Sequence, residues 1–231
     1  MPSIKENLLK VQERIAAAAA RAGRRADEII LVGVSKTHPA IAIQEAFQAG
    51  VRHFGENRVQ EWEVKRVGTK NLDATWHLIG HLQSNKAARA AKLFHSVDSV
   101  DDFAVAQKLD RARAEASLTE RLRVLIEVRV APEETKSGAE VNAVPALAEQ
   151  IAHQPRLELA GLMCIPPFVE AEAVRPYFRR LRELRDELRA QLGLPLGVLS
   201  MGMSHDFEVA IEEGATEVRV GTALFGMRQT R

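Results

Sequence analysis

The sequence predicts an α/β protein that folds as a single-domain (β/α)8 TIM barrel with an extra N-terminal helix. Three observations support this fold class. Short apolar runs alternate with segments of helical periodicity, eight such βα units fit within 231 residues, and no linker or low-complexity segment divides them. Eight units in one uninterrupted chain are typical of a barrel, with a doubly wound open sheet as the alternative. We therefore expect residues 1–231 to form one domain.

The first segment predicts an amphipathic helix. Apolar residues recur there at helical spacing, at Ile4, Leu8, Val11, Ile15 and Ala18. Glu6 and Glu13 interrupt the segment, which argues against a targeting sequence. No stretch of the sequence is long and apolar enough to suggest a membrane span.

The barrel elements follow in order along the chain. Apolar runs predict strands at 29–35, 51–56, 75–80, 93–98, 122–130, 157–165, 195–201 and 217–221. The segments between them predict helices near 39–49, 58–67, 84–92, 101–116, 141–153, 172–192 and 205–213. In such a barrel the active site lies at the carboxyl ends of the strands, so polar residues at those ends are the functional candidates.

Composition narrows the class of partner. The chain carries 32 basic and 31 acidic residues, a formal net charge of +1. This balance does not favour nucleic acid or an anionic membrane. The single cysteine, Cys164, excludes an internal disulfide, suits a reducing cytoplasm and is predicted to be a core thiol. With no heptad pattern and no large apolar strip, we expect a cytoplasmic monomer.

Lys36 directly follows the apolar strand 29–35 and is the most informative residue of the chain. A lysine at the end of such a strand is partly desolvated, which favours the neutral amine that attacks a carbonyl group. Lys36 is therefore a candidate Schiff-base former. The alternative is a structural ammonium that reaches water or pairs with a carboxylate.

The loops after the seventh and eighth strands have the chemistry of a phosphate site. Gly202 and Gly221 let backbone amides approach an anion. Ser200, Ser204 and Thr222 add small hydroxyl donors. Because barrels commonly bind phosphate between these two loops, we predict such a site there.

Strand alternation and barrel closure predict that Lys36 and Arg219 face one cavity. Both residues fall on the inward face of their strands, and closure makes the first and eighth strands neighbours. An amine for a carbonyl, a cation for a ring nitrogen and donors for a phosphate together suit pyridoxal 5'-phosphate. The alternative for Arg219 is a salt bridge with Glu217 or Glu127.

Seven motifs occur in order over nearly the whole chain. They are Val34-Ser35-Lys36-Thr37, Phe54-Gly55-Glu56-Asn57 with Val59-Gln60-Glu61, Trp76-His77-Leu78-Ile79-Gly80 with Leu82-Gln83-Ser84-Asn85-Lys86, Thr135-Lys136-Ser137-Gly138, Gly161-Leu162-Met163, Leu199-Ser200-Met201-Gly202-Met203-Ser204 and Val218-Arg219-Val220-Gly221-Thr222. With these motifs the chain resembles the pyridoxal phosphate homeostasis proteins. That family is similar in fold to the N-terminal barrel of alanine racemase, of fold type III among pyridoxal phosphate proteins.

The resemblance implies a role for each residue of the site. Lys36 would carry the Schiff base, Asn57 would lie by the cofactor ring, and Arg219 would meet the pyridine nitrogen. The residues that would hold the phosphate are Ser200, Gly221 and Thr222. Two positions depart from the family pattern, with His38 where some members have a second lysine and Arg58 where some have tyrosine. Any accessory role that family members assign to a lysine at position 38 or a tyrosine at position 58 is therefore not expected here.

His77 on the third strand is a further predicted cofactor-binding residue. As alternatives, His77 and Glu56 are candidates for acid/base steps or for hydrogen-bonding core residues. A metal site at His77 and His81 is disfavoured, because no carboxylate or thiolate lies near them in sequence. We predict no metal ion.

The predicted function is that of a carrier without substantial amino-acid catalysis. The resemblance implies that alanine racemase takes its second base, a tyrosine, from a C-terminal domain that this sequence does not contain. The single tyrosine, Tyr177, is expected on the outside of the barrel. An arginine at the ring nitrogen also keeps that nitrogen unprotonated, which weakens the ring as an electron sink. We therefore expect storage of pyridoxal phosphate and its delivery to apo-enzymes.

The alternative function is a Schiff-base enzyme, either amino-acid racemase-like or a sugar-phosphate aldolase, since Lys36 and the phosphate loops suit either one. Lys136, in the loop after the fifth strand, is expected to be a solvated charge. Its alternative role is to receive the aldehyde from Lys36.

Overall fold

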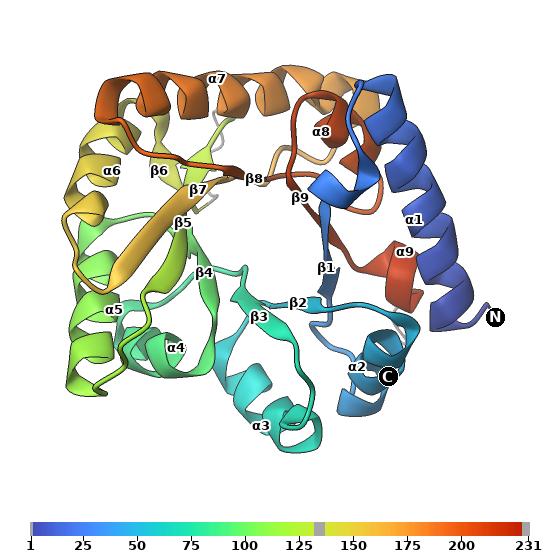
Figure 1. Cartoon of the computed structure of the whole chain (residues 1–231), viewed down its shortest axis with the longest axis horizontal. Helices are drawn as coiled ribbons and strands as arrows, with labels where there is room; N and C mark the ends of the chain where they lie inside the picture. The colour runs from blue at the N-terminus through green and yellow to red at the C-terminus, as the bar shows by residue number, and fades with distance from the viewer. Residues whose placement is uncertain (1, 132–136, 228–231) are drawn as a thin grey trace.

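The computed structural model describes residues 2–131 and 137–227, which form one closed barrel of eight parallel strands with helices outside it (Figure 1). The barrel strands are β1 (Ile30–Val34), β2 (His53–Glu56), β3 (Thr75–Leu78), β4 (Ser96–Val100), β5 (Leu122–Arg129), β7 (Leu157–Met163), β8 (Val198–Ser200) and β9 (Glu217–Val220). They lie in the order β4-β3-β2-β1-β9-β8-β7-β5, and pairing of β4 with β5 closes the ring. The predicted barrel is confirmed, and the open sheet is excluded.

The helices agree with the predicted periodic segments. They are α1 (Ile4–Arg21), α2 (Ala40–Ala49), α3 (Val59–Thr69), α4 (Ala87–Leu93), α5 (Phe103–Glu115), α6 (Val144–Ala152), α7 (Arg175–Leu192) and α8 (Phe207–Glu212). Short 3-10 turns precede three of them, at η2 (Ser84–Lys86), η3 (Val141–Ala143) and η4 (Ala171–Val174), and a fourth, η1 (Ala26–Glu28), precedes β1. Two short elements were not predicted: the strand β6 (Ala139–Glu140), which pairs with the end of β5, and the helix α9 (Thr222–Phe225).

The extra N-terminal helix α1 begins at a complete capping box. Ser3 accepts a hydrogen bond from the Glu6 amide, and the Glu6 carboxylate accepts one from the Ser3 amide. The apolar face of α1 packs against α8, α2 and α9. Asn7 donates to the carbonyl oxygen of Leu224 at 3.0 Å, so α1 also holds α9 in place.

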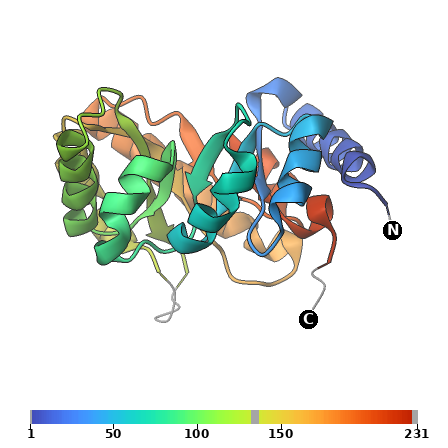
Figure 2. The ribbon, with the colours of Figure 1, turned by 90° about the horizontal axis from the view of Figure 1, so that it is seen from below.

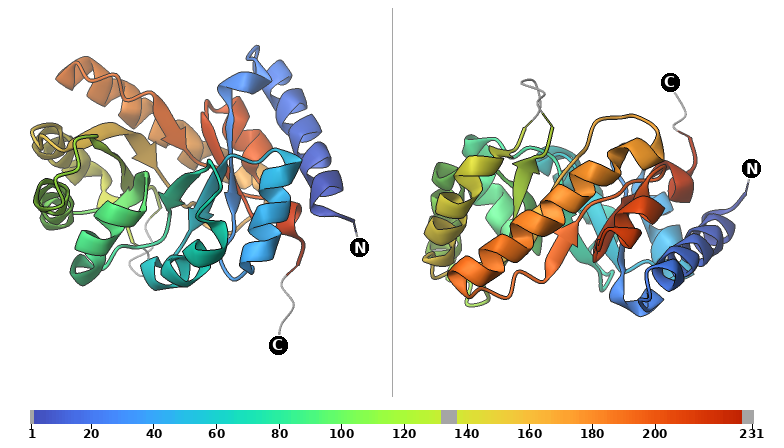
Figure 3. Two further views of the ribbon diagram at one scale, coloured as in Figure 1. Left: turned by 60° about the horizontal axis from the view of Figure 1, so that its bottom comes forward. Right: turned by 90° about the horizontal axis from the view of Figure 1, so that it is seen from above.

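The helices cover the outside of the barrel on all sides. Figure 2 shows α4 and α5 packed together at one end of the molecule and α1 and α2 at the other. In Figure 3, α7 crosses the outside of β7 and β8, while α1 lies beside α8. Among residues 2–131 and 137–227, no helix combines the length and the apolar character that a membrane span requires. Since all barrel strands run parallel, their carboxyl ends meet at one face of the barrel.

Candidate functional site

The first side chain at the carboxyl ends of the strands is Lys36. It lies two residues beyond β1, where it is half-buried. Its neighbour Ser35 is fully buried, and the next residue, Thr37, has a backbone φ of 67°. This φ lies in the left-handed region, which a β-branched residue rarely adopts. The turn that carries Lys36 is therefore held in a strained conformation.

Arg219 lies on β9, directly beside β1. Val32 pairs with Arg219 in the parallel register, so the two predicted site strands are adjacent as expected. The guanidinium of Arg219 is buried and donates to the Ser200 hydroxyl at 2.9 Å and to the Cys164 carbonyl oxygen at 2.8 Å. Within the described part of the chain it forms no salt bridge, contrary to the alternative that paired it with an acidic residue. The charge of Arg219 is thus held by neutral acceptors.

The loops after β8 and β9 lie together, as the phosphate prediction requires. The Arg219 amide donates to the Gly202 carbonyl oxygen at 2.9 Å, and the Ala223 amide donates to the Ser204 hydroxyl at 3.2 Å. Gly202 has a φ of 94°, and a Cβ atom there would lie 2.8 Å from the Cα of Phe207. Glycine therefore suits position 202 for two reasons: it adopts the positive φ without strain, and it has no side chain to collide with Phe207.

The predicted phosphate residues differ in their surroundings. Thr222 is exposed at the first position of α9, and Gly221 is half-buried directly before it. Ser200 is fully buried, and its hydroxyl contacts Arg219. The structure thus brings Ser200 to the guanidinium, while Gly221 and Thr222 lie in the loop after β9. Their contact with a phosphate stays a prediction.

Asn57 follows β2 and has an unsatisfied polar atom. Its Oδ1 atom is buried and has no hydrogen-bond partner among the described residues. A Cβ atom at Gly80 would lie 2.4 Å from the backbone oxygen of Asn57, so only glycine permits this close approach of the two strand ends. A pocket of about 750 Å³ opens there, lined by Asn57, Glu61, Gly80, His81 and Lys86 among others. A buried amide oxygen beside a cavity is suited to contact a ligand.

Glu127 on β5 is a buried acidic group that is not among the predicted site residues. One of its oxygens accepts a hydrogen bond from the Ser137 hydroxyl at 2.9 Å, and the other has no partner among the described residues. Burial raises the pKa of Glu127, an effect that the charge of Arg219 partly offsets. The available signal in the sequence was a glutamate between the apolar residues Ile126 and Val128 of the fifth strand.

His77 lies inside the barrel within a charged network. Its Nδ1 atom is 2.9 Å from Asp98, and its Nε2 atom is 3.0 Å from Nδ1 of His53. Burial acts to lower the pKa of His77, but the Asp98 carboxylate outweighs it, so the net direction is upward. Glu217 lies 3.9 Å away and pairs with Arg123 at 2.8 Å. His77 is thus hydrogen-bonded to other side chains inside the barrel. Its contact with a cofactor stays a prediction.

The same network bears on metal binding. His77, Asp98 and Glu217 each offer a ligand atom, and these atoms lie within 4.8 Å of one another. Asp98 and Glu217 already pair with His77 and Arg123, at 2.9 Å and 2.8 Å, which disfavours an added cation. His81, the other half of the metal alternative, lies apart from His77, with a side chain that is 54% exposed and 3.4 Å from Asp101.

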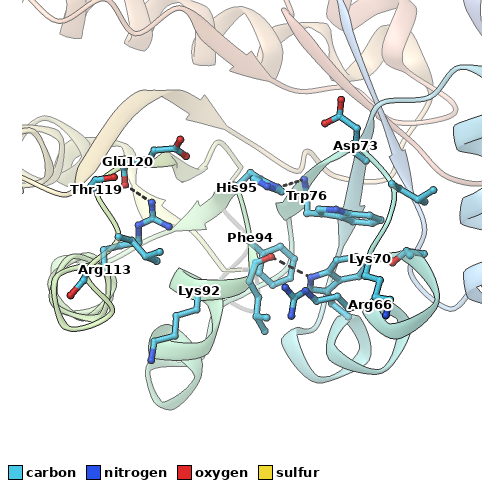
Figure 4. A pocket seen from close by; sticks show the side chains of 17 residues that line it. Arg66, Lys70, Asp73, Trp76, Lys92, Phe94, His95, Arg113, Thr119 and Glu120 are labelled. Carbon is cyan, nitrogen blue, oxygen red and sulfur yellow. Dashed lines mark hydrogen bonds between the residues drawn. The ribbon is translucent and has the colours of Figure 1, made fainter.

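A second pocket, of about 530 Å³, lies at the opposite end of the barrel, where the strands begin (Figure 4). The Nδ1 atom of His95 accepts a hydrogen bond from the Trp76 amide at 3.0 Å. Arg113 reaches from α5 to the carbonyl oxygen of Glu120 and also donates to that of Ala91. Arg113 thus links α4 to the segment that precedes β5. This pocket lies away from Lys36.

Comparison with known proteins places this geometry in a family. Residues 6–229 match the family model described as the alanine racemase N-terminal domain. The pyridoxal phosphate homeostasis protein of Aquifex aeolicus is 47% identical over 225 residues, covering 97% of this chain and 98% of that protein. The protein of the same name from Pseudomonas aeruginosa is 48% identical over 229 residues, covering 99% and 97%.

Solved structures agree. PipY of Synechococcus elongatus without pyridoxal phosphate superimposes with a TM-score of 0.87 at 39% identity, covering 97% of this chain and 100% of PipY. PipY with pyridoxal phosphate bound gives a TM-score of 0.82 at 41% identity, covering 92% and 100%. Alanine racemase of Corynebacterium glutamicum shares the fold, with a TM-score of 0.70 at 16% identity over 94% of this chain and 60% of that enzyme.

Proposed function

Because the chain belongs to the pyridoxal phosphate homeostasis protein family, we propose that it binds pyridoxal 5'-phosphate through Lys36 and serves in its storage and delivery. One observation carries the proposal. Lys36 and Arg219 come from adjacent strands at one end of the barrel, beside two joined loops rich in small residues. This arrangement supplies an amine, a fixed cation and room for an anion together.

The described residues carry the chemical groups that pyridoxal 5'-phosphate requires. Lys36 would bind the aldehyde carbon as a Schiff base, with loss of water, and Arg219 would donate to the ring nitrogen. Asn57, with its unsatisfied buried oxygen, would contact the ring, and the Gly221 and Thr222 amides would bind the phosphate. Ser200 would act through Arg219, whose guanidinium it holds.

The proposed role is that of a cytoplasmic, monomeric carrier rather than an enzyme. A guanidinium cannot give up its proton to a ring nitrogen, so Arg219 supports binding more than carbanion chemistry. Tyr177 lies on α7, outside the barrel, and so is not available as a second base. Glu56 is bonded to Ser35 and Lys65, which disfavours its role as an acid or base in an aldolase. Lys136, the proposed acceptor of the aldehyde, lies outside the described residues.

The absorbance spectrum tests this proposal. Purified protein incubated with pyridoxal phosphate should show a visible Schiff-base band, and borohydride reduction followed by peptide mass spectrometry should place the adduct on Lys36. Lys36→Ala should lack both the band and the adduct. A protein that stays colourless with added cofactor would refute the cofactor assignment.

The carrier role has a separate test. Holo-protein incubated with single L-amino acids should form neither the D-enantiomer nor the keto acid at an appreciable rate. Transfer should then be measured by adding an apo-enzyme and following its recovered activity. Sustained racemisation or transamination would contradict the carrier role and favour the enzymatic alternative.

A further inference from the structure

The turn at Ser35, Lys36 and Thr37 holds a strained backbone next to the proposed reactive amine. Thr37 has a φ of 67°, where the side chain of a β-branched residue crowds its own backbone. Such conformations persist only where surrounding contacts enforce them. Since Lys36 and Thr37 share a peptide unit, whatever holds Thr37 also orients Lys36.

Glu61, in the first turn of α3, provides that contact. Its Oε1 atom accepts a hydrogen bond from the Thr37 amide at 2.5 Å. The same oxygen lies 2.7 Å from the Lys65 ammonium, one helical turn further on. Burial acts to raise the pKa of Glu61, but the hydrogen bonds from Lys65 and Thr37 lower it below its ordinary value, so the carboxylate is charged at neutral pH.

Lys65 also holds Ser35, the residue that precedes Lys36. Its ammonium donates to the Ser35 carbonyl oxygen at 2.8 Å and to both oxygens of Glu56 at 3.0 Å. The Ser35 hydroxyl donates to Glu56 at 2.6 Å. The Lys65 side chain is only 10% exposed and that of Glu56 is fully buried. We call Ser35, Thr37, Glu56, Glu61 and Lys65 the α3 clamp.

The α3 clamp lies on the outer face of the strands, away from the barrel interior. Strand alternation points Val34 into the barrel, while Ser35, just beyond β1, contacts Glu56 and the α3 residue Lys65. The clamp therefore acts on Lys36 through the backbone. Burial raises the pKa of Glu56, and the adjacent Lys65 and the Ser35 hydroxyl act against this by favouring the charged form.

We propose that Glu61 and Lys65 are positioning residues that fix the backbone on both sides of Lys36, so that its amine is aimed at the cofactor aldehyde. The proposal rests on the proposed function, in which the Lys36 nitrogen attacks the aldehyde carbon, the carbonyl oxygen leaves as water and a C=N bond forms. Orientation of this kind contributes to the rate of attack more than to noncovalent binding.

The experiment measures the rate of Schiff-base formation by stopped-flow absorbance after mixing with pyridoxal phosphate. Glu61→Gln should form the band about tenfold more slowly, because the neutral amide holds the Thr37 turn less firmly. Noncovalent binding of 4'-deoxypyridoxine 5'-phosphate, which lacks the aldehyde, should change less than twofold, because glutamine keeps the size of Glu61 where that side chain lines the pocket beside Asn57. Thermal unfolding of each variant verifies that it folds.

Thr37→Gly provides the rescue. Glycine adopts a positive φ without strain, so in the Thr37→Gly background the Glu61→Gln substitution should slow Schiff-base formation by less than about threefold. Glu63→Gln is the matched control on the same helix, since Glu63 contacts Arg89 on the surface and leaves the clamp untouched. It should react at the wild-type rate.

The outcomes are distinct. If the wild-type protein forms no adduct on Lys36, the proposed function fails and the positioning role fails with it. If the wild type forms the adduct and folded Glu61→Gln reacts equally fast, only the positioning role is overturned. An equal loss of rate in the threonine and glycine backgrounds would also overturn it, because the effect would not pass through the Thr37 backbone.

Discussion

Arg219 illustrates how a single buried cation can be prepared for a ligand. Its hydrogen bonds go to the Ser200 hydroxyl and the Cys164 carbonyl oxygen, both neutral, so its charge is oriented but not cancelled. A carboxylate partner would fix the side chain equally well, yet it would compete with any electron-rich atom of a ligand. The position of Arg219 could be predicted from strand alternation. Its partners could not, because they depend on the register of β8 and β9 and on the chain beyond β7.

Arg219→Lys should therefore lower both stability and cofactor affinity. A lysine cannot reach both acceptors in the same geometry, so Ser200 or the Cys164 carbonyl loses its partner, at a cost of about 1–3 kcal/mol in the free energy of unfolding. Urea denaturation of the cofactor-free protein measures this cost. Arg189→Lys on the exposed surface of α7 is the control, and equal unfolding free energies for the two variants would contradict the argument.

At the scale of elements, the ends of β2 and β3 define one side of the site because their backbones nearly touch. The approach of Gly80 to Asn57 places the unsatisfied Asn57 oxygen beside the pocket. The strands themselves were predictable from their apolar runs, and so were the main helices. The strand β6 and the helix α9 were not, since two and four residues are too short to show a period. The contact of Gly80 with Asn57 likewise could not be predicted from the sequence, because it depends on how closely the ends of β2 and β3 approach each other.

Gly80→Ala tests this contact. The new Cβ atom would lie 2.4 Å from the Asn57 oxygen and 2.8 Å from its Cα, and backbone atoms cannot move aside as a side chain can. We expect a loss of about 1–3 kcal/mol in unfolding free energy and weaker pyridoxal phosphate binding. Gly197→Ala, where a Cβ atom meets nothing within 4 Å, is the control for both measurements. Wild-type affinity in Gly80→Ala would show that the strand ends are not part of the site.

For the molecule as a whole, the interior network sets part of the dependence of stability on pH. Burial, helped by the charges of His77 and Arg123, lowers the pKa of His53 from 6.5 to about 4. The unfolded chain takes up this proton near pH 6.5 and the folded chain does not, so the stabilisation is present above pH 6.5 and is lost as the pH falls toward 4. For His77 the pKa is raised, because Asp98 outweighs the effect of burial, so its contribution is lost only as the pH rises above 6.5.

His53→Asn should accordingly flatten the fall in stability between pH 6.5 and pH 5. The amide cannot take up a proton, and it can keep a hydrogen bond to His77. Urea unfolding at half-unit pH steps measures the slope, with the exposed His153→Asn as control. An unchanged slope in His53→Asn would show that another group is responsible.

The interior network also determines from which end of the barrel a ligand can reach Lys36. It consists of His53, His77, Asp98, Arg123 and Glu217. His77, Asp98 and Glu217 are fully buried, and hydrogen bonds join them to His53 and Arg123, so this network occupies the interior of the barrel. A cofactor bound at Lys36 as proposed would enter and leave by the end of the barrel where the strands finish. For the proposed delivery, an apo-enzyme would therefore have to bind at the end of the barrel where Lys36 lies.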